Sequence, residues 1–481
     1  MQNIEPNKND RKILLILLFL PCLLIRRALD NDTWFILNSG RYVMNNGIPH
    51  IEPFSIHENM KFVMQQWLTD VVFWNIYNTV GELGLFLLVM ICYAIVIILL
   101  YKLTMNISEE NFFISYSVTI ITSILIYTYM VTRPTIITLV IVMIELNALE
   151  LYAKRGEYKY LLVLPILSLL MINFHAALWP MLFILILPYV IDSFEFRIGC
   201  VRGQGYNKQF LFLSIVLMFM AAFVNPYGID AMLYLVKSTG YPYMKYIMEL
   251  QPPNVSSFAG ALIYTYIAFV VFVYIFYRRG KSKIRYFLLT TGTIFMVLIS
   301  VRNITYFALC SLFPLAYYLK DLNINYISTN KSSKKFRIII IILIVMVVTI
   351  GMYENGLHYN TAMQYKDLNE TVDYIIKNED ISNIMLYTGF NEGSLVQFRG
   401  LRTYIDPRAE VYFKKQNNKD DIFNEYFELR YGKVYYKYIL DKYNFTHLII
   451  EKGELLDTYL KEDENYEVIY ENEEYNLFKK E

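Results

Sequence analysis

Long apolar runs constrain the fold of this chain more than any other feature of its sequence. A run of about 17–25 mainly apolar residues can cross the hydrocarbon core of a bilayer as a helix. The first run lacks the small-residue cleavage site of a signal peptide, so we expect it to remain as an anchor. The sequence thus predicts a polytopic α-helical membrane protein with about 11 transmembrane helices. The predicted spans are 13–29, 83–101, 112–131, 134–152, 160–174, 177–192, 210–225, 258–277, 286–301, 303–319 and 338–353.

Composition agrees with a membrane protein. The chain has 481 residues, of which 56% are hydrophobic and 18% are charged, whereas soluble domains carry about 25% charged residues. The formal net charge of +1 gives no bulk field for nucleic acid, which we exclude as a partner. The four cysteines show neither metal-ligand spacing nor the pattern of a disulfide framework.

Lysine and arginine predict the orientation in the membrane. These residues concentrate in alternate loops, including "RRGKSKIR" (278–285) and "KSSKKFR" (331–337). Positively charged loops face the cytoplasm, so the N-terminus is predicted to be cytoplasmic. Residues 1–353 then form a multi-pass domain in a bacterial plasma membrane, and residues 354–481 lie outside.

The tail after the last span has a different character. Short strand patterns alternate with helical patterns there, which is typical of a small α/β domain. The predicted strands are "NIMLYTG", "RTYIDPR", "THLIIEKG" and the hairpin "YEVIYENEEYNLFKK". The predicted helices are "DLNETVDYIIKNE", "NNKDDIFNEYFELR" and "KVYYKYILDKYN".

The first outer loop, residues 30–82, contains two further predicted helices. Residues 33–45 and 64–79 are rich in tryptophan and tyrosine, and short amphipathic helices of this kind lie in the membrane interface. Asp32 is a candidate N-cap for the first helix, and Gly47 is a candidate for its end.

Polar residues gather at the ends of spans that are predicted to face outward. The predicted inner loops hold only scattered Lys and Arg, whereas polar groups inside or beside a membrane are costly and usually functional. This shared face predicts one site near the outer headgroup level. The residues concerned are Asp30, Asp32, Arg133, Asn173, His175, Asn225, Glu249 and Arg302.

Each of these residues also has a structural explanation. Asp32 is suited to a simple helix cap, and the two arginines are suited to anchoring lipid headgroups. His175 fits the role of a hydrogen-bonded core histidine. Asn173 and Asn225 fit the role of side chains that join helices. Only the common location favours the functional interpretation.

The chemistry available at such a place is sugar transfer from a lipid carrier. A lipid-phosphate sugar presents an anionic phosphate beside its reactive carbon at this depth. Transfer to a hydroxyl needs a carboxylate to accept the proton, and it needs arginine or histidine to stabilise the leaving phosphate. We therefore expect a polyprenyl-phosphate sugar as donor and a cell-envelope glycan, lipid or protein as acceptor.

The motifs of the outer segments resemble those of a known group. "DNDTWFILNSGRYVMNNGIPHIEPFS" followed by "QQWLTDVVFW" resembles the first outer loop of the C superfamily of glycosyltransferases (GT-C). The similarity continues through "TRPT", "NFH", "NPYG", "ELQPP", "RN" and the tail segment "TYIDPRAEVY". Within this superfamily, the chain resembles lipid-phosphate-sugar transferases of the protein mannosyltransferase and aminoarabinose transferase type. The resemblance implies an inverting transfer.

The resemblance also implies roles. Asp32, fifteen positions before Gly47, matches the acidic residue that follows the first span of these transferases, with Asp30 supporting it or helping to hold a divalent cation. Arg133, His175 and Arg302 would bind the donor phosphate. The predicted substrate contacts are Glu249, Asn173, Asn225, Trp34 and Glu52. Asp406 and Arg408 of the tail are expected to form a buried structural pair.

Three other functions stay open at this stage. A polysaccharide polymerase or ligase that acts on the outer face would need the same binding site for a lipid phosphate. A transporter for lipid-linked sugars would favour inverted repeats and polar residues at mid-bilayer, and neither is found. A non-catalytic scaffold on the same fold is the third, because Thr33 replaces the Glu that usually follows the acidic residue.

Overall fold

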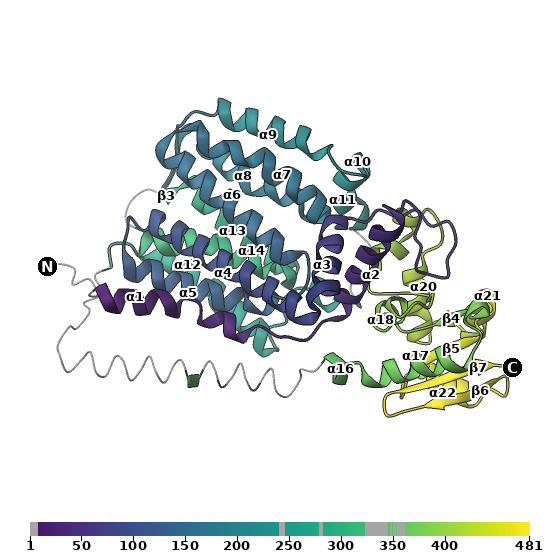
Figure 1. Cartoon of the computed structure of the whole chain (residues 1–481). Coiled ribbons are helices and arrows are strands. Elements are labelled where there is room, and N and C mark those ends of the chain that lie inside the picture. Colours follow the sequence, from purple (N-terminus) through teal and green to yellow (C-terminus); the bar gives the residue numbers. More distant parts are fainter. Residues whose placement is uncertain are drawn as a thin grey trace.

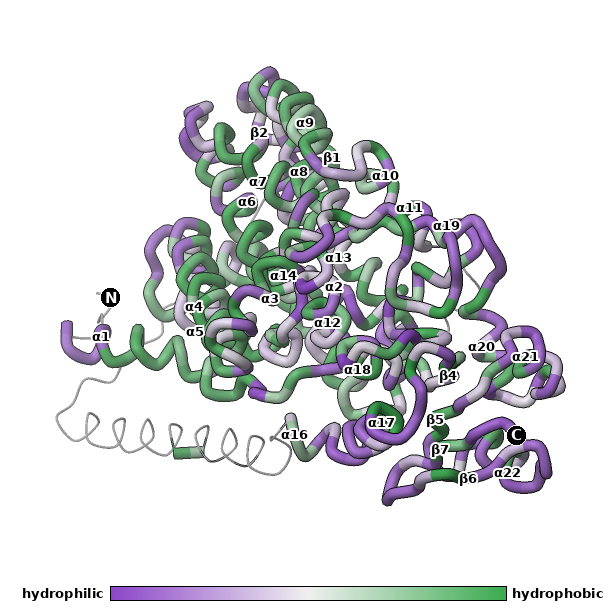
Figure 2. The backbone as a smooth tube through the Cα atoms, turned by 45° about the vertical axis from the view of Figure 1, so that its right-hand side comes forward, coloured by the Kyte–Doolittle hydropathy of each residue, from purple (hydrophilic) through white to green (hydrophobic). Residues whose placement is uncertain are grey.

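The computed structural model describes residues 8–239, 246–278, 282–322 and 361–481, with residues 345, 346, 349 and 353 between the last two ranges. It shows a bundle of helices and, beside it, an α/β part that ends in the C-terminus (Figure 1). Two helices of the first outer loop lie between them. Figure 2 shows that hydrophobic residues concentrate in the bundle, whereas hydrophilic residues are frequent in the α/β part.

Four helices among the described residues are long and apolar enough to cross a membrane. The 26 residues of the longest one extend roughly 39 Å, which exceeds the hydrocarbon thickness of about 30 Å. The four are α4 (Glu82–Ile107), α5 (Phe112–Ile126) with its 3₁₀ extension η2 (Tyr127–Tyr129), α6 (Thr135–Arg155) and α12 (Phe258–Phe276).

Shorter apolar helices complete the described bundle. Every residue of α14 except Tyr317 is buried, so this helix lies at the centre, surrounded by protein. The shorter segments are η3 (Tyr158–Leu162), α7 (Val163–Phe174), η4 (Ala176–Leu178), α8 (Pro180–Asp192), α9 (Gln209–Ala222), α13 (Ile284–Ile299) and α14 (Ile304–Tyr318). The eleventh predicted span, 338–353, falls mostly outside the described residues, and the total of about 11 stays a prediction.

The first predicted span is not one continuous helix. α1 (Lys8–Leu17) ends before a short 3₁₀ helix, η1 (Leu20–Leu24), whose first turn contains Pro21. Proline has no backbone N–H to donate, so it is tolerated at the start of a helix and breaks its interior. The helix predicted over 13–29 is therefore interrupted before Pro21, and its crossing of the membrane stays a prediction.

The two predicted loop helices are confirmed as α2 (Asn31–Asn46) and α3 (Trp67–Val80). α2 begins two residues earlier than predicted, and its N-cap is Asp30 rather than Asp32. Gly47 ends α2 at a φ of +80°. The two helices cross closely at Gly40, where an added Cβ would lie 2.0 Å from the carbonyl oxygen of Asp70. Only glycine fits this crossing.

Smaller elements connect the bundle at both ends. At the predicted cytoplasmic end, three short strands form a sheet that the sequence did not predict. They are β1 (Glu195–Ile198), β2 (Val201–Gln204), antiparallel to β1, and β3 (Ser282–Lys283), parallel to β2. At the other end lie α10 (Ile229–Met232), α11 (Tyr234–Ser238) and the 3₁₀ helices η6 (Met248–Leu250) and η7 (Val301–Asn303).

An ionic cluster, which we call the inner cluster, lies at the predicted cytoplasmic end of the bundle. Arg285 of α13 donates from Nε and Nη2 to the carboxylate of Glu150 of α6, at 3.0 and 2.8 Å, and from Nη1 to Asp192 of α8. Tyr286 also donates to Glu150, at 2.6 Å. The expectation that the inner side holds only scattered Lys and Arg is therefore wrong, because Glu150 and Asp192 are hidden within apolar runs.

The α/β part contains a four-stranded sheet with the order β4-β5-β7-β6. The predicted hairpin is confirmed as β6 (Tyr466–Glu471) and β7 (Tyr475–Lys480), which pair antiparallel. β4 (Leu386–Tyr387) and β5 (His447–Glu451) pair in parallel. "RTYIDPR" forms no strand: Thr403 makes only isolated bridges, to Ser55 and Leu386, because its polar and turn-forming residues are used to join the tail to the first loop.

Helices cover this sheet. The predicted helices are found as α17 (Lys366–Asn378), α20 (Ile422–Arg430) and α21 (Tyr436–Lys442). α17 has the predicted length and begins one residue earlier, whereas α20 and α21 are each five residues shorter than predicted. The sequence did not predict the others, which are α16 (Thr361–Gln364), η8 (Ile381–Asn383), α18 (Gly393–Phe398), η9 (Ala409–Tyr412), α19 (Lys414–Asn417) and α22 (Leu455–Lys461). The predicted domain boundary at residue 353 falls in a stretch that is largely outside the described residues.

A buried ion pair joins the tail to the first loop. Arg408 donates to Asp406 from Nε, at 2.8 Å, and from Nη2, at 2.6 Å; the same Nη2 donates to Glu52 of the loop, at 2.8 Å. Asp406 is fully buried and Arg408 nearly so, which agrees with the predicted structural pair. Tyr412 donates to the same carboxylate. The α/β part is thus fixed against the loop that carries α2.

Candidate functional site

The centre of the candidate site is one arginine between two carboxylates. Arg133 follows η2 and precedes α6, and its Nε lies 2.6 Å from Oδ2 of Asp30 and 3.1 Å from Oδ2 of Asp32. Nη1 of the same arginine lies 3.5 Å from Oε1 of Glu249. These four residues come from three separate loops, and we call them the outer cluster. The structure thus brings together the first-loop aspartates and the "TRPT" segment, as predicted.

Local hydrogen bonds fix the two aspartates in place. Oδ1 of Asp30 accepts from the backbone N–H of Thr33, at 3.0 Å, and from its hydroxyl, at 2.8 Å, which leaves Oδ2 for Arg133. The Thr33 hydroxyl also lies 2.7 Å from the Thr132 hydroxyl. Because Asp30 is the N-cap residue of α2, Asp32 lies in the first turn of the helix and has no capping role. The Thr33–Thr132 contact was not foreseen, although Thr132 is the first residue of "TRPT".

A second pair of loops brings Arg302 toward this cluster. The Ser300 hydroxyl donates to the backbone carbonyl of Glu249, at 2.9 Å, and the Val301 N–H donates to that of Gln251, also at 2.9 Å. These bonds hold η6 against η7. Arg302 is exposed and lies close enough to Asp32 to lower the pKa of that carboxyl. Its side chain has no hydrogen bond or ion pair with any residue that the structure describes, which makes it an unpaired cation beside the outer cluster.

Burial raises the pKa of Asp32 to about 7. The guanidinium of Arg133 opposes this shift, whereas the negative charges of Asp30 and Glu249 add to it. The same carboxylates raise the pKa of Arg133, although burial alone would lower it. A carboxyl whose pKa lies near neutrality is suited to accept and release a proton at physiological pH.

His175 lies at the end of α7, directly behind the arginine segment. The ring is buried, and Nδ1 lies 2.8 Å from the hydroxyl of Thr138, in the first turn of α6. Burial lowers the pKa of His175 to about 3, and the charge of Arg302 adds to the shift. The imidazole is therefore neutral, and it would meet a phosphate as a hydrogen-bond donor and not as a cation.

The two asparagines join chain segments. Asn173 donates to the carbonyls of Leu169 and Val224, at 2.8 and 2.9 Å, and accepts from the indole N–H of Trp67, at 2.9 Å. Asn225 donates to the carbonyls of Ala222 and Gly228 and accepts from Tyr227 in a local turn. Their amides are occupied, and the structure does not bring them into the outer cluster.

Trp34 and Glu52 lie at the contact with the tail. Trp34 packs edge-on to Tyr365, at 5.6 Å between ring centroids, and its buried indole N–H has no hydrogen-bond partner in the described ranges of the chain. The Glu52 carboxylate accepts from the N–H groups of Phe54 and Ser55 and from Arg408. Glu52 is therefore paired away from the outer cluster.

In the part of the chain that the structure describes, the outer cluster shows no metal-ligand group, and a divalent cation stays a prediction. The described residues contain no group of three or more His, Cys, Asp or Glu side chains arranged to hold a metal ion. Oδ2 of Asp30 and Oδ2 of Asp32 both face the Arg133 guanidinium, which occupies the position that a cation would take between them.

Comparisons with known proteins find similarity in structure alone. No protein-family model matches the sequence, and no curated protein matches it. The fold matches the oligosaccharyltransferase of Archaeoglobus fulgidus, tethered to an acceptor peptide, with a TM-score of 0.60 and 12% identity over 92% of this chain and 69% of that one. The same enzyme, AglB, with an inhibitory peptide and dolichol phosphate gives 0.61 and 10% identity at the same coverage.

A second neighbour matches over almost its full length. ArnT from Cupriavidus metallidurans, bound to undecaprenyl phosphate, gives a TM-score of 0.51 and 10% identity over 98% of both chains. Both neighbours are members of the GT-C superfamily. The chain shares the GT-C fold. At these identities the likeness concerns the fold, and the individual residues of the site rest on the geometry above.

Proposed function

We propose that this protein is a membrane glycosyltransferase that moves a sugar from a polyprenyl-phosphate donor to an acceptor on the outer face of the membrane. The single observation that carries the proposal is the outer cluster, in which Asp32 has a pKa near 7 beside two arginines. The structural neighbours support it, since one is bound to dolichol phosphate and the other to undecaprenyl phosphate.

In this reaction Asp32 acts as the general base. Its ionised carboxylate accepts the proton of the acceptor hydroxyl as that oxygen attacks the anomeric carbon. The bond between this carbon and the phosphate oxygen breaks, and attack from the opposite face inverts the configuration. Asp30 keeps Arg133 and the start of α2 in position. General base catalysis of this kind contributes about 10²–10⁴-fold to the rate.

The arginines stabilise the leaving polyprenyl phosphate. Arg302, which is exposed and unpaired among the described residues, binds the phosphate directly. Arg133 adds its remaining N–H groups, and His175 adds a neutral donor where its Nε2 carries the proton. Charge-assisted hydrogen bonds to phosphate strengthen as negative charge develops on the leaving oxygen. Glu249, half exposed at the edge, faces the sugar or the acceptor.

A complementation experiment tests the proposal. Cells that lack the gene are supplied with wild-type protein, with Asp32→Asn or with the control Asp441→Asn, which changes an exposed carboxylate of the tail. We expect Asp32→Asn to lower envelope-glycan modification at least about 100-fold and to accumulate lipid-linked sugar at normal protein levels. The Asp441→Asn variant should complement fully. Full complementation by Asp32→Asn would remove the proposed base.

A second candidate is the transfer of a whole oligosaccharide from its lipid carrier. The likeness to an oligosaccharyltransferase over 92% of this chain favours it. The same cells separate the two functions, because the mass of the accumulated lipid-linked species shows whether one sugar or an assembled oligosaccharide is the donor. Accumulation only in the inner leaflet would instead indicate a transporter.

A further inference from the structure

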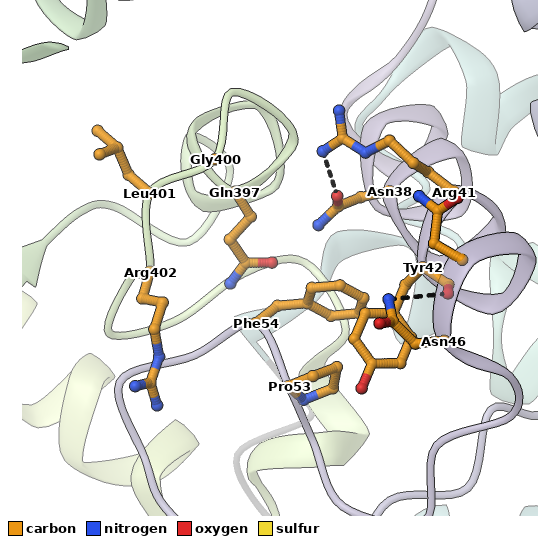
Figure 3. A pocket seen from close by; sticks show the side chains of 11 residues that line it. Asn38, Arg41, Tyr42, Asn46, Pro53, Phe54, Gln397, Gly400, Leu401 and Arg402 are labelled. Atoms are coloured by element: carbon orange, nitrogen blue, oxygen red, sulfur yellow. Dashed lines mark hydrogen bonds between the residues drawn. The ribbon is translucent and has the colours of Figure 1, made fainter. Parts of the chain in front are cut away.

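A separate pocket lies where the first loop meets the tail. Its cavity measures about 220 Å³ and is lined by eleven residues of three segments (Figure 3). Pocket volumes of about 300–1,000 Å³ are usual for drug-sized ligands, so this one has room for a single small ring. None of its residues belongs to the outer cluster.

Two aromatic rings form one wall of the pocket. Tyr42 of α2 and Phe54 of the loop meet edge to face, with ring centroids 5.5 Å apart and an interplanar angle of 80°, and Pro53 lies beside them. Asn38, Asn45 and Asn46 of α2 also line the pocket. Apolar ring surface next to amide groups suits a pyranose, which has C–H faces and a rim of hydroxyls.

The inner part of the pocket holds an unsatisfied acceptor. Gln397 of α18 is 4% exposed, and its Nε2 donates to Thr403 and Asp406, at 2.8 and 2.9 Å. These two bonds fix the orientation of the amide, so Oε1 is the atom on the pocket side, and it has no hydrogen-bond partner among the described residues. Figure 3 shows this oxygen turned toward Asn38 and Phe54. A sugar hydroxyl would supply the donor that it lacks.

The pocket also favours a negative charge. Arg41 and Arg402 line it from opposite sides, and none of the lining residues is Asp or Glu. Nε of Arg402 donates to the Ser55 carbonyl, at 2.7 Å, while its Nη1 and Nη2 have no partner in the described part of the chain. Arg41 uses Nη2 for Asn38 and the Phe398 carbonyl. Free guanidinium N–H groups bind carboxylate or phosphate.

We infer that this pocket binds one acidic sugar unit, a pyranose that carries a carboxylate or a phosphate. That the sugar belongs to the acceptor rests on the proposed function; the binding itself does not. The pocket and the outer cluster share α2, and Asp32 and Arg41 lie roughly 14 Å apart along its axis. An acceptor that fills both places is an extended, acidic glycan, held at one unit while another unit meets Asp32.

Binding of simple sugars to the purified full-length protein in detergent tests this site without turnover. The probes are methyl β-D-glucuronide, glucose 6-phosphate and the neutral methyl β-D-glucoside. We expect saturable binding with at least one anionic sugar about fivefold tighter than the glucoside; which anion binds more tightly identifies the charged group. Equal affinity for all three, or no saturable binding, would overturn the inference.

Variants locate the site. Arg402→Gln should abolish the preference for the anionic sugars, and Asn45→Phe should weaken all three by filling the pocket. Lys366→Gln, which removes one positive charge from an exposed side chain of α17, should change nothing. Binding unaffected by both pocket variants would place the sugar elsewhere and refute the inference. The Asp32→Asn variant should bind the sugars normally. The sugar-binding inference and the proposed transfer function can therefore be refuted independently of each other.

Discussion

The inner and outer clusters are built alike but differ in accessibility. In both, one arginine faces carboxylates from other segments of the chain. The Arg285, Glu150 and Asp192 side chains are exposed by 1, 3 and 0%, whereas Arg133, Asp30, Asp32 and Glu249 are exposed by 27, 28, 27 and 50%. The two groups lie roughly 23 Å apart along α6.

The difference in accessibility distinguishes a cluster that stabilises the fold from a cluster that can bind a ligand. Arg285 satisfies Glu150 with two parallel hydrogen bonds and has no opening toward solvent, so it fixes α6, α8 and α13 to one another. Arg133 lies at unequal distances from three carboxylates. Arg302, a nearby cation without a partner among the described residues, is exposed. A cluster that is open to solvent can accept a charged ligand, while a cluster that is closed to solvent cannot.

Breaking the inner cluster should have the largest effect. Replacing Arg285 with Met leaves two buried carboxylates without their cation, and we expect the free energy of unfolding to fall by about 3–5 kcal/mol. Unfolding in mixed micelles of SDS and a mild detergent measures this loss. The exposed Arg197→Met, in β1, is the control and should unfold like wild type. Unchanged stability of the Arg285 variant would contradict the assigned structural role.

The same substitution in the outer cluster should separate activity from stability. For Arg133→Met we expect at least about a 100-fold loss of transfer, because a preorganised donor to the leaving phosphate is removed. Its effect on unfolding should stay below about 1 kcal/mol, since the ion pairs are partly exposed. Transfer and unfolding are measured on the same preparation. A large loss of stability with retained transfer would reverse the roles of the two clusters.

The crossing of α2 and α3 provides a smaller perturbation of the outer side. A methyl group at Gly40 would overlap the Asp70 carbonyl and the Trp74 side chain, so Gly40→Ala should cost about 1–3 kcal/mol through overpacking. It should also lower transfer by displacing the helix that carries Asp32. Gly292→Ala, in open space on α13, is the matched control. If both alanine variants behave like wild type, the crossing is not close-packed.

The pH profile gives the finest test of the outer cluster. Asp32 acts as a base only when ionised, so the log of transfer activity should rise with pH at unit slope below about 7 and level off above. The Asp30→Asn substitution removes a negative charge that raises the pKa of Asp32, so the midpoint of the profile should move to lower pH. Asparagine also caps helices well, so α2 should keep its start. A flat profile, or a midpoint that moves upward, would contradict the assignment of Asp32.

Length and apolar character made most of the bundle predictable, because a helix in lipid must satisfy its own backbone. The convergence of Asp32, Arg133 and Glu249 was predictable for a related reason: polar residues of a bundle are confined to its ends, and a common end brings distant segments together. The hairpin at 466–480 followed from strand alternation and a polar turn.

What could not be predicted depended on tertiary pairing. Glu150 and Asp192 are single charges within apolar runs, and only the packing of three helices shows their partner. Glu52 belongs to a loop motif that suggested a substrate contact, yet the folding of the tail onto this loop pairs it with Arg408. Gln397 lies in a segment with no helical pattern strong enough to be noticed, so the sugar pocket was not visible in the sequence.

The most direct test is a structure of the protein in lipid nanodiscs with undecaprenyl phosphate. We expect the phosphate to lie against Arg302 and Arg133, with oxygens about 2.7–2.9 Å from their N–H groups, and the Asp32 carboxylate to face the side from which an acceptor would attack. A phosphate bound elsewhere, with the outer cluster unchanged and closed to it, would rule out the outer cluster as the transfer site.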